Sequence, residues 1–300
     1  MGVECRVDDS KLVIVIDGVE VLRYTAFSDQ PSGGNPAGVV LDATDLDDST
    51  MLAIAAQVGY SETAFLWALE AAGSYRIRYF SPAGEVPFCG HATIASAVAL
   101  VDHGSPSEVH FHTRSGEVTA RVVSEQGHPL ATLTSVKPSV APAAEAAVAE
   151  TLASLGWSAS DLDTNLPARV VFAGARHLIL GVRSREVLAG LSYDFERLRS
   201  LMAQEDWTTI ELVWRETPTV LHARVPFPVG GIVEDPATGA GAAALGAYLR
   251  ELRLVHPPVR VTVHQGDDMG RPSLLLIDLD AGDGGIRVSG RAVALPQPQA

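Results

Sequence analysis

Two short turns in this chain place polar side chains directly before Ala-rich runs. In the stretch 225–250 the adjacent acids Glu234 and Asp235 precede a run that is expected to form a helix. The turn Cys89-Gly90-His91 precedes a second such run. The start of a helix presents unpaired backbone N–H groups and the positive end of the helix dipole. Each turn therefore predicts a place that can hold an anionic group such as a carboxylate.

The side chains in these turns also have structural interpretations. An Asp before Pro is a common turn and cap residue, so we expect Asp235 to combine structural and functional roles. A helix start disfavours the protonated form of His91, so its neutral imidazole could donate one hydrogen bond and accept another. The backbone N–H groups of Gly90, Gly239 and Ala240 are candidate donors to a substrate carboxylate.

A third candidate, Glu62, lies in the segment SETAFLW, which is expected to be a strand. The apolar residues around it predict partial burial. Desolvation disfavours the charged form of a carboxyl group, which suits a group that takes up and releases a proton near neutral pH. The alternative for Glu62 is a surface ion pair at a strand edge.

The expected elements follow one order twice. A strand, a Pro/Gly-rich loop, a polar turn and a buried Ala-rich helix occur around Gly90-His91 and again around Gly239-Ala240. This predicts two pseudo-equivalent halves with the active site in a cleft between them. We place the N-terminal half at 1–136 plus about 286–300 and the C-terminal half at 137–285. Helices are expected over 45–58, 92–104, 141–153 and 194–204. Strands are expected at 12–16, 19–27, 61–67, 75–80, 131–136, 209–214, 219–225, 259–264, 274–279 and 286–293, with a short strand after the turn at 34–36. Two strands joined by a turn are expected at 109–123 and again at 169–182.

Length and composition narrow the function classes. The chain has 300 residues with 47% hydrophobic residues, which suits a globular protein of two domains. Its formal net charge of -14 makes nucleic acid or an anionic membrane surface an unfavourable partner. Two cysteines, Cys5 and Cys89, allow no disulfide framework. The charged N-terminal segment has no apolar core of a signal peptide, so a cytoplasmic location is expected.

Six motifs in this order together resemble a known family. They are GNPAGVV (34–40), SETAF (61–65), EVPFCGHAT (85–93), EDPATGAG (234–241), QGDDMGRPS (265–273) and VSGRAV (288–293). The chain resembles the phenazine-biosynthesis PhzF-like isomerase/epimerase family, which has the diaminopimelate epimerase-like fold. The resemblance implies an α+β fold in which each half is a mostly antiparallel, barrel-like sheet wrapped around a central helix. It also implies a homodimer.

The resemblance further implies roles for particular residues. Glu62 corresponds to the glutamate that moves a proton, and His91 and Asp235 assist it. Substrate contacts fall on Ser61, Gly90, Gly239 and Ala240. The family often has Ser at the position of Ala240 and a polar residue at that of Gly59, so both positions depart from its pattern.

Rival interpretations of the same motifs are weaker. Epimerases of this fold use two cysteines as bases, but Cys89 has no second cysteine in the EDPATGAG turn and suits a small buried residue. The pattern Gly239-x-Gly241-x-x-Ala244 matches a loose dinucleotide fingerprint, yet a Rossmann glycine turn would follow its strand at once. His110 and His112 share a strand face but lack a third ligand, so no metal site is expected.

The sequence therefore predicts a cofactor-independent isomerase or epimerase that moves a proton on a small, anionic, carboxylate-bearing metabolite. Glu62, His91 and Asp235 are the catalytic candidates, and Cys89 is a further candidate. The alternatives are a nicotinamide-dependent oxidoreductase and a non-catalytic binding protein on a degenerate isomerase fold.

Overall fold

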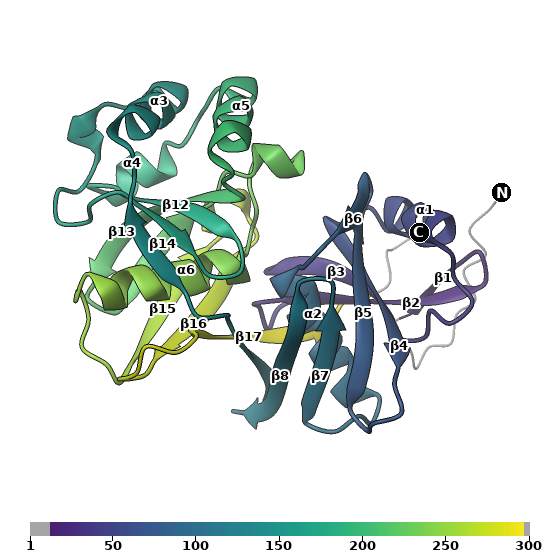
Figure 1. Cartoon of the computed structure of the whole chain (residues 1–300). Helices are drawn as coiled ribbons and strands as arrows, with labels where there is room; N and C mark the ends of the chain where they lie inside the picture. Colours follow the sequence, from purple (N-terminus) through teal and green to yellow (C-terminus); the bar gives the residue numbers. More distant parts are fainter. Residues whose placement is uncertain (1–12, 297–300) are drawn as a thin grey trace. The chain divides into compact units, whose positions relative to one another are not determined.

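The computed structural model describes residues 13–296 of a mixed α/β protein (Figure 1). Cys5, Leu12 and the charged N-terminal segment lie outside the described residues. The described chain divides into two compact units. Unit 1 comprises the described residues up to Thr134 and from Ser289 onward, and unit 2 runs from Ser135 to Val288.

In unit 1 a mixed sheet of eight strands closes into a barrel. The order around it is β2, β3, β4, β5, β7, β8, β9 and β17, and β17 pairs again with β2. The pairs β3–β4 and β5–β7 are parallel. β1 adds to β2, and β6 adds to β5. The strands are β1 (Val13–Ile16), β2 (Val19–Ala26), β3 (Asn35–Val40), β4 (Glu62–Ala68), β5 (Ser74–Ser81), β6 (Gly84–Val86), β7 (Glu108–Thr113), β8 (Gly116–Glu125), β9 (His128–Thr134) and β17 (Arg287–Ala294).

Unit 2 contains seven strands that pair in chain order. The pairs β12–β13 and β14–β15 are parallel, and the other four are antiparallel. The strands are β10 (Ser139–Pro142), β11 (Arg169–Phe172), β12 (Arg176–Gly181), β13 (Thr209–Thr217), β14 (Val220–Arg224), β15 (Val259–Gln265) and β16 (Ser273–Leu279).

The two units share one sequence of strand pairings. From β17 through β2, β3, β4, β5 and β7 to β8 the pairs run antiparallel, antiparallel, parallel, antiparallel, parallel, antiparallel. From β10 to β16 the pairs follow the same series. A long helix enters each unit at the second parallel crossover, α2 (Gly90–Asp102) between β5 and β7 and α6 (Gly239–Glu251) between β14 and β15.

These two Ala-rich helices are buried because their small side chains let strands approach closely. α2 contacts β2, β3, β4, β8 and β9, and every residue from His91 to Leu100 is buried. α6 contacts β10, β11, β12, β13 and β16, and every residue from Gly241 to Leu249 is buried. A helix that is apolar on all faces can be stable in water only when it is covered on all faces.

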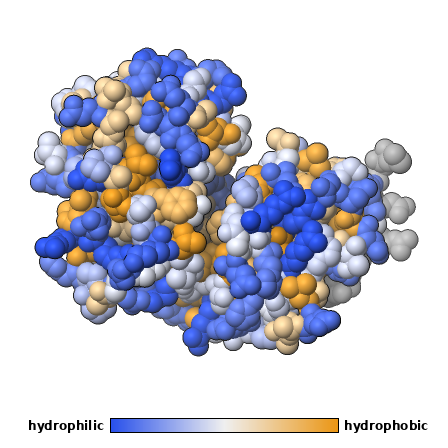
Figure 2. All heavy atoms as spheres, in the orientation of Figure 1, coloured by the Kyte–Doolittle hydropathy of each residue, from blue (hydrophilic) through white to orange (hydrophobic). Residues whose placement is uncertain are grey.

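The remaining helices lie on the outside of the sheets. α1 (Asp48–Val58) packs on β4 and β5. Its N-cap is Asp47, whose side chain accepts a hydrogen bond from Thr50 N, and it ends at Gly59 in the left-handed conformation (φ 72°). In unit 2, α3 (Glu145–Leu155), α4 (Arg185–Ala189) and α5 (Phe195–Glu205) contribute to one apolar core with β12 and β13. Figure 2 shows polar residues interspersed with apolar ones on the visible faces.

The sequence-based assignments differ from the structure most clearly at two helices. The helix expected over 141–153 begins only at Glu145, and residues up to Pro142 form β10 instead. A proline inside a helix loses a hydrogen bond and clashes with the preceding turn, whereas an edge strand tolerates it. The short helix α4 was not expected, although Ser184 caps it by accepting a hydrogen bond from Val187 N.

Candidate active site

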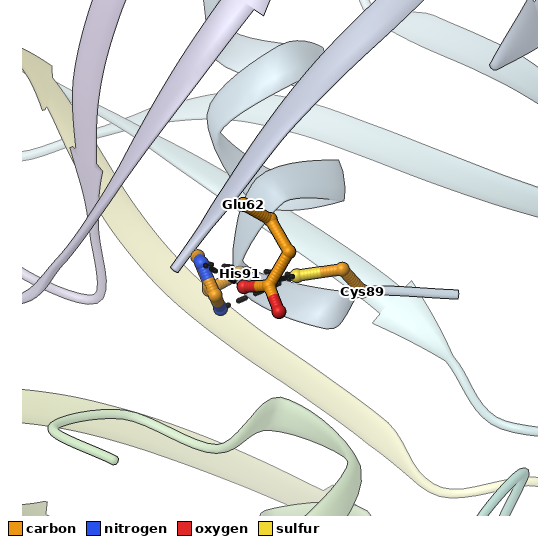
Figure 3. A group of neighbouring side chains, drawn as sticks. All are labelled: Glu62, Cys89 and His91. Atoms are coloured by element: carbon orange, nitrogen blue, oxygen red, sulfur yellow. Dashed lines mark hydrogen bonds and ion pairs between the residues drawn. The ribbon is translucent and has the colours of Figure 1, made fainter. Parts of the chain in front are cut away.

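Glu62, Cys89 and His91 come together in unit 1 at the start of α2 (Figure 3). Glu62 is the first residue of β4, opposite Ala37 of the parallel strand β3. Cys89 is the N-cap of α2, and His91 lies in its first turn. Glu62 Oε2 lies 3.3 Å from His91 Nε2 and accepts a hydrogen bond from the Cys89 thiol at 3.5 Å.

The partners of His91 define its tautomer. Asn35 donates from its amide nitrogen to Nδ1 at 3.2 Å, so Nε2 carries the proton. Nε2 lies 3.3 Å from Ser61 Oγ and at the same distance from Glu62 Oε2. Burial lowers the pKa of His91 more than the neighbouring carboxylate of Glu62 raises it. The imidazole is therefore a neutral donor toward Glu62, and the contact is no ion pair.

Glu62 presents its two carboxylate oxygens differently. Oε2 faces the thiol of Cys89 and the imidazole of His91. Oε1 has no hydrogen-bonding or ionic partner among the described residues of unit 1. The Glu62 side chain is 12% exposed, whereas that of His91 is 7% exposed. One oxygen of this largely buried carboxylate is thus left without a partner among the described residues of unit 1.

Buried contacts fix the turn that carries Cys89 and His91. Arg78 makes a bidentate pair with Glu85 at 2.7 and 2.6 Å, and Arg114 contacts the same carboxylate at 2.9 Å. Thr93 donates to the backbone oxygen of Cys89 at 2.6 Å. The glutamate of EVPFCGHAT therefore anchors the loop before α2.

In unit 2 the turn before α6 is braced from β15. Asp235 Oδ2 accepts a hydrogen bond from Thr238 Oγ1 at 2.6 Å. The Gln265 side chain donates to Asp235 O at 2.7 Å and to Thr238 Oγ1 at 2.9 Å, and it accepts from Thr238 N at 3.2 Å. Asp235 and Gln265 are 7% and 2% exposed. The turn is therefore a fixed, buried unit.

The other acid of the pair is structural. Glu234 accepts a bidentate pair from Arg224 of β14, with distances of 2.9 and 2.5 Å. Its side chain is buried. The strong charge-assisted pair ties the turn to β14, which leaves Asp235 as the single carboxylate of this turn with a functional assignment.

A buried acid that the sequence did not single out lies beneath the first turn of α6. Thr209 donates to Glu211 Oε1 at 2.8 Å, and His177 Nδ1 lies 2.7 Å from the Thr209 hydroxyl. Burial, together with the charge of Asp235, raises the pKa of Glu211 to about 8. Burial alone lowers the pKa of His177 to about 4. Both side chains are therefore neutral at pH 7.

The predicted site residues fall into two groups. Ser61, Glu62, Cys89, Gly90 and His91 lie together in unit 1. In unit 2, Gly239 and Ala240 are the first residues of α6 and follow the turn of Asp235. Gly90, Gly239 and Ala240 are thus in first helical turns, where backbone N–H groups lack intrahelical partners. That both groups act on one substrate stays a prediction.

Sequence reasoning assigned no role to Asn35, Thr238, Gln265 or Glu211. Asn35 and Gln265 were within the motifs GNPAGVV and QGDDMGRPS, and both are polar residues at buried strand positions. A polar residue at a buried strand position needs a hydrogen-bond partner, which is the signal that could have identified them. Glu211 stands at the same kind of position, in β13.

The dinucleotide interpretation of Gly239 and Gly241 is wrong on local geometry. The strand before α6 ends at Arg224, and the Asp235 turn intervenes, so no glycine turn follows the strand directly. Gly241 serves close packing instead, because a Cβ there would lie 2.0 Å from Glu211 Oε1.

His110 and His112 lie near Glu108 and Glu117, at 3.5 and 3.2 Å, on the exposed side of β7. None of the described helices is long and apolar enough to cross a membrane.

Comparison with known proteins gives the same family. The family described as "Phenazine biosynthesis-like protein" (PhzC-PhzF) matches residues 24–297. The chain is 30% identical over 279 residues to "Uncharacterized isomerase YfhB" of Bacillus subtilis, covering 90% of this chain and 94% of the relative. It is 31% identical over 252 residues to trans-2,3-dihydro-3-hydroxyanthranilate isomerase of Pseudomonas fluorescens, covering 83% and 86% of the two chains.

Solved structures show the same fold. A phenazine biosynthesis protein of the PhzF family from Bacillus anthracis superimposes with a TM-score of 0.82 at 27% identity, covering 92% of this chain and 97% of the other. A hydroxyproline epimerase from Agrobacterium vitis, with trans-4-hydroxy-L-proline bound, shares the fold at a TM-score of 0.63 and 14% identity, covering 92% and 89%. The chain belongs to the phenazine biosynthesis-like (PhzF) family of isomerases.

Proposed function

We propose that this protein is a cofactor-independent isomerase or epimerase that moves a proton on a small, carboxylate-bearing metabolite. The contact between Glu62 and the neutral donors Cys89 and His91 carries the proposal. These donors engage Oε2, so Oε1 is the atom that takes the substrate proton. The chemistry needs neither an electron acceptor nor a hydride carrier, because the substrate is not oxidised.

The reaction has two balanced steps. Glu62 Oε1 first takes a proton from a carbon of the substrate, and the electrons of the broken C–H bond move into the adjacent unsaturated or carboxylate group. The protonated Glu62 then returns the proton, either to another carbon or to the opposite face of a planar intermediate. His91 Nε2–H donates to the Glu62 carboxylate before the first step and again after the second. General acid–base catalysis of this kind contributes about 10²–10⁴-fold to a rate.

The substrate carboxylate is assigned to the first turns of the central helices. Gly90 offers its backbone N–H at the start of α2, and Gly239 and Ala240 offer theirs at the start of α6. Fixed N–H donors bind an anion at little reorganisation cost. Asp235, held by Thr238, is assigned to a polar group of the substrate. Ala240 lacks a hydroxyl, which narrows the substrates to those that need no donor there.

The relatives suggest which compounds to test first. One curated relative is named for the isomerisation of trans-2,3-dihydro-3-hydroxyanthranilate. A structural neighbour is named a hydroxyproline epimerase. Both compounds are small cyclic carboxylates, and each has an acidic C–H next to a carboxylate or a conjugated system. Cyclic amino acids and dihydroaromatic carboxylates therefore form the first panel. Homodimer formation stays a prediction.

Incubation of the protein with this panel in D₂O tests the proposal without an added cofactor. Mass spectrometry should show product formation or incorporation of one deuterium for at least one compound. A compound that stabilises the protein against heat but shows neither turnover nor exchange would favour the non-catalytic alternative. That alternative has two supporting observations, the departures at Ala240 and Gly59 from the residues that are common in the family.

A further inference from the structure

The cluster at the start of α2 combines three kinds of metal ligand. Glu62, Cys89 and His91 each offer one ligand atom, and these atoms lie within 4.8 Å of one another. We propose that the three side chains form a binding site for a thiophilic divalent cation such as Zn²⁺, although the sequence predicted no metal site. A bound cation would take Glu62 out of proton transfer. The site would therefore make the enzyme sensitive to zinc inhibition.

The separations of the three ligand atoms suit a tetrahedral ion. Bonds of about 2.3 Å to sulfur and about 2.0–2.2 Å to nitrogen and oxygen place neighbouring ligand atoms roughly 3.3–3.6 Å apart. Cys89 Sγ lies 3.5 Å from Glu62 Oε2 and 3.7 Å from His91 Nε2. Nε2 lies 3.3 Å from Oε2. Figure 3 shows the three side chains converging from β4 and the start of α2.

Binding requires defined proton movements. The Cys89 thiol loses its proton to solvent when sulfur bonds to the cation. The proton of the His91 imidazole moves from Nε2, which becomes the ligand atom, to Nδ1. Asn35, whose amide now donates to Nδ1, turns its amide oxygen to accept that proton. A hydrogen bond of this kind to the second ring nitrogen fixes the tautomer of many metal-binding histidines.

Charge and exposure also favour a cation with this ligand set. A thiolate and a carboxylate together neutralise a divalent ion, so the occupied site carries no net charge. Glu62 is 12% exposed, which leaves room for water as the fourth ligand. Three protein ligands and one water form the usual coordination of a zinc ion that remains accessible.

Cobalt(II) provides a probe that does not depend on any enzymatic activity. The full-length protein, freed of metal by dialysis against a chelator, is titrated with Co²⁺. We expect one ion per chain, a thiolate-to-cobalt charge-transfer band and the intense visible bands of tetrahedral Co²⁺. Added Zn²⁺ should displace the cobalt and abolish both. A spectrum of octahedral cobalt without the charge-transfer band would overturn the proposal.

Matched variants assign the spectrum to these residues. Cys89→Ser should lose the charge-transfer band and weaken metal binding by about tenfold or more, since even second-layer changes cost 10–100-fold. Cys5→Ser should retain the band, and its loss there would place the metal elsewhere. His112→Ala tests the exposed His–Glu pairs of β7 and should leave the spectrum unchanged.

A second measurement covers the case in which Cys89→Ser fails to fold. Zn²⁺ should slow alkylation of Cys89 in the wild-type protein, as located by peptide mass mapping, while leaving Cys5 reactive. Equal alkylation of Cys89 with and without Zn²⁺ would contradict the site. Zinc inhibition of turnover is a separate readout that rests on the proposed isomerase activity. If the cobalt spectrum is positive but zinc does not inhibit turnover, the result would count against Glu62 as the proton carrier and not against metal binding.

Discussion

Ser61 Oγ and His91 Nε2 lie 3.3 Å apart, so the residue before the proposed proton carrier orients its partner. Ser61→Ala removes this contact and leaves the contact between His91 and Glu62 intact. A typical hydrogen bond contributes about 0.5–1.5 kcal/mol, which corresponds to a loss of roughly two- to tenfold in kcat/KM. Steady-state kinetics on the substrate identified in the panel measures this loss. A loss equal to that of Glu62→Gln would show that Ser61 acts in the chemistry itself.

Gln265 should matter for stability as well as for substrate binding. Gln265→Leu keeps the approximate size but leaves the backbone groups of Asp235 and Thr238 without their partners. Each buried unsatisfied group costs about 1–3 kcal/mol, so urea unfolding should show a loss of this size or more. Gln265→Glu can still accept from Thr238 N but cannot donate to Asp235 O and buries a charge, so it should also lose stability. Equal stability of Gln265→Leu and wild type would contradict the bracing role.

Gly241 should not tolerate a side chain. The methyl group of Gly241→Ala would lie 2.0 Å from Glu211 Oε1, and overpacking of this kind costs about 1–3 kcal/mol or more. Gly284→Ala is the matched control, since a Cβ there meets nothing within 4 Å. Shortening the acid in Gly241→Ala/Glu211→Ser should recover part of the loss. If the double variant instead loses the sum of the two single-variant stability losses, the added methyl group does not clash with Glu211.

The buried pair Glu211 and His177 predicts how stability depends on pH. The pKa of Glu211 is raised from 4.5 to about 8, so its stabilising contribution is complete below about pH 4.5 and is lost as the pH rises through 8. The pKa of His177 is lowered from 6.5 to about 4, so its contribution is complete above about pH 6.5 and is lost as the pH falls through 4. Of these two groups, only Glu211 changes its contribution to the free energy of unfolding between pH 6.5 and 8.

The free energy of unfolding should therefore fall between pH 6.5 and 8, by at most about 1.4 kcal/mol per pH unit from this group. Glu211→Gln remains neutral at every pH and should remove that part of the slope. Urea unfolding at several pH values measures the slope for both proteins. An unchanged slope in the variant would show that Glu211 does not titrate in this range.

The site residues in unit 1 could be predicted from sequence because they sit in contiguous motifs. Glu62 opens a strand and His91 opens a helix, and both positions follow from local patterns of apolar residues. The start of α1 was equally local, since Asp47 caps it. Such features depend on neighbours in the chain, which a sequence displays directly.

What the sequence did not reveal depends on contacts between distant segments. Gln265 braces a turn near Asp235, and Glu211 lies beneath Gly241, yet neither pairing leaves a periodic signal. The choice between β10 and a longer α3 was also missed, because the Ala/Glu composition favours a helix while Pro142 prevents one. The side-chain tautomer of His91 follows from Asn35, on a strand that only the fold brings close.

The most direct test of the central claim compares wild type and Glu62→Gln in D₂O with the same substrate. Glutamine keeps the size of Glu62 but cannot accept a proton from carbon. The account predicts that wild type incorporates solvent deuterium at the isomerised carbon. It predicts that the variant, folded and binding the substrate, does so at least about 10²-fold more slowly. Undiminished deuterium incorporation by Glu62→Gln would contradict the account.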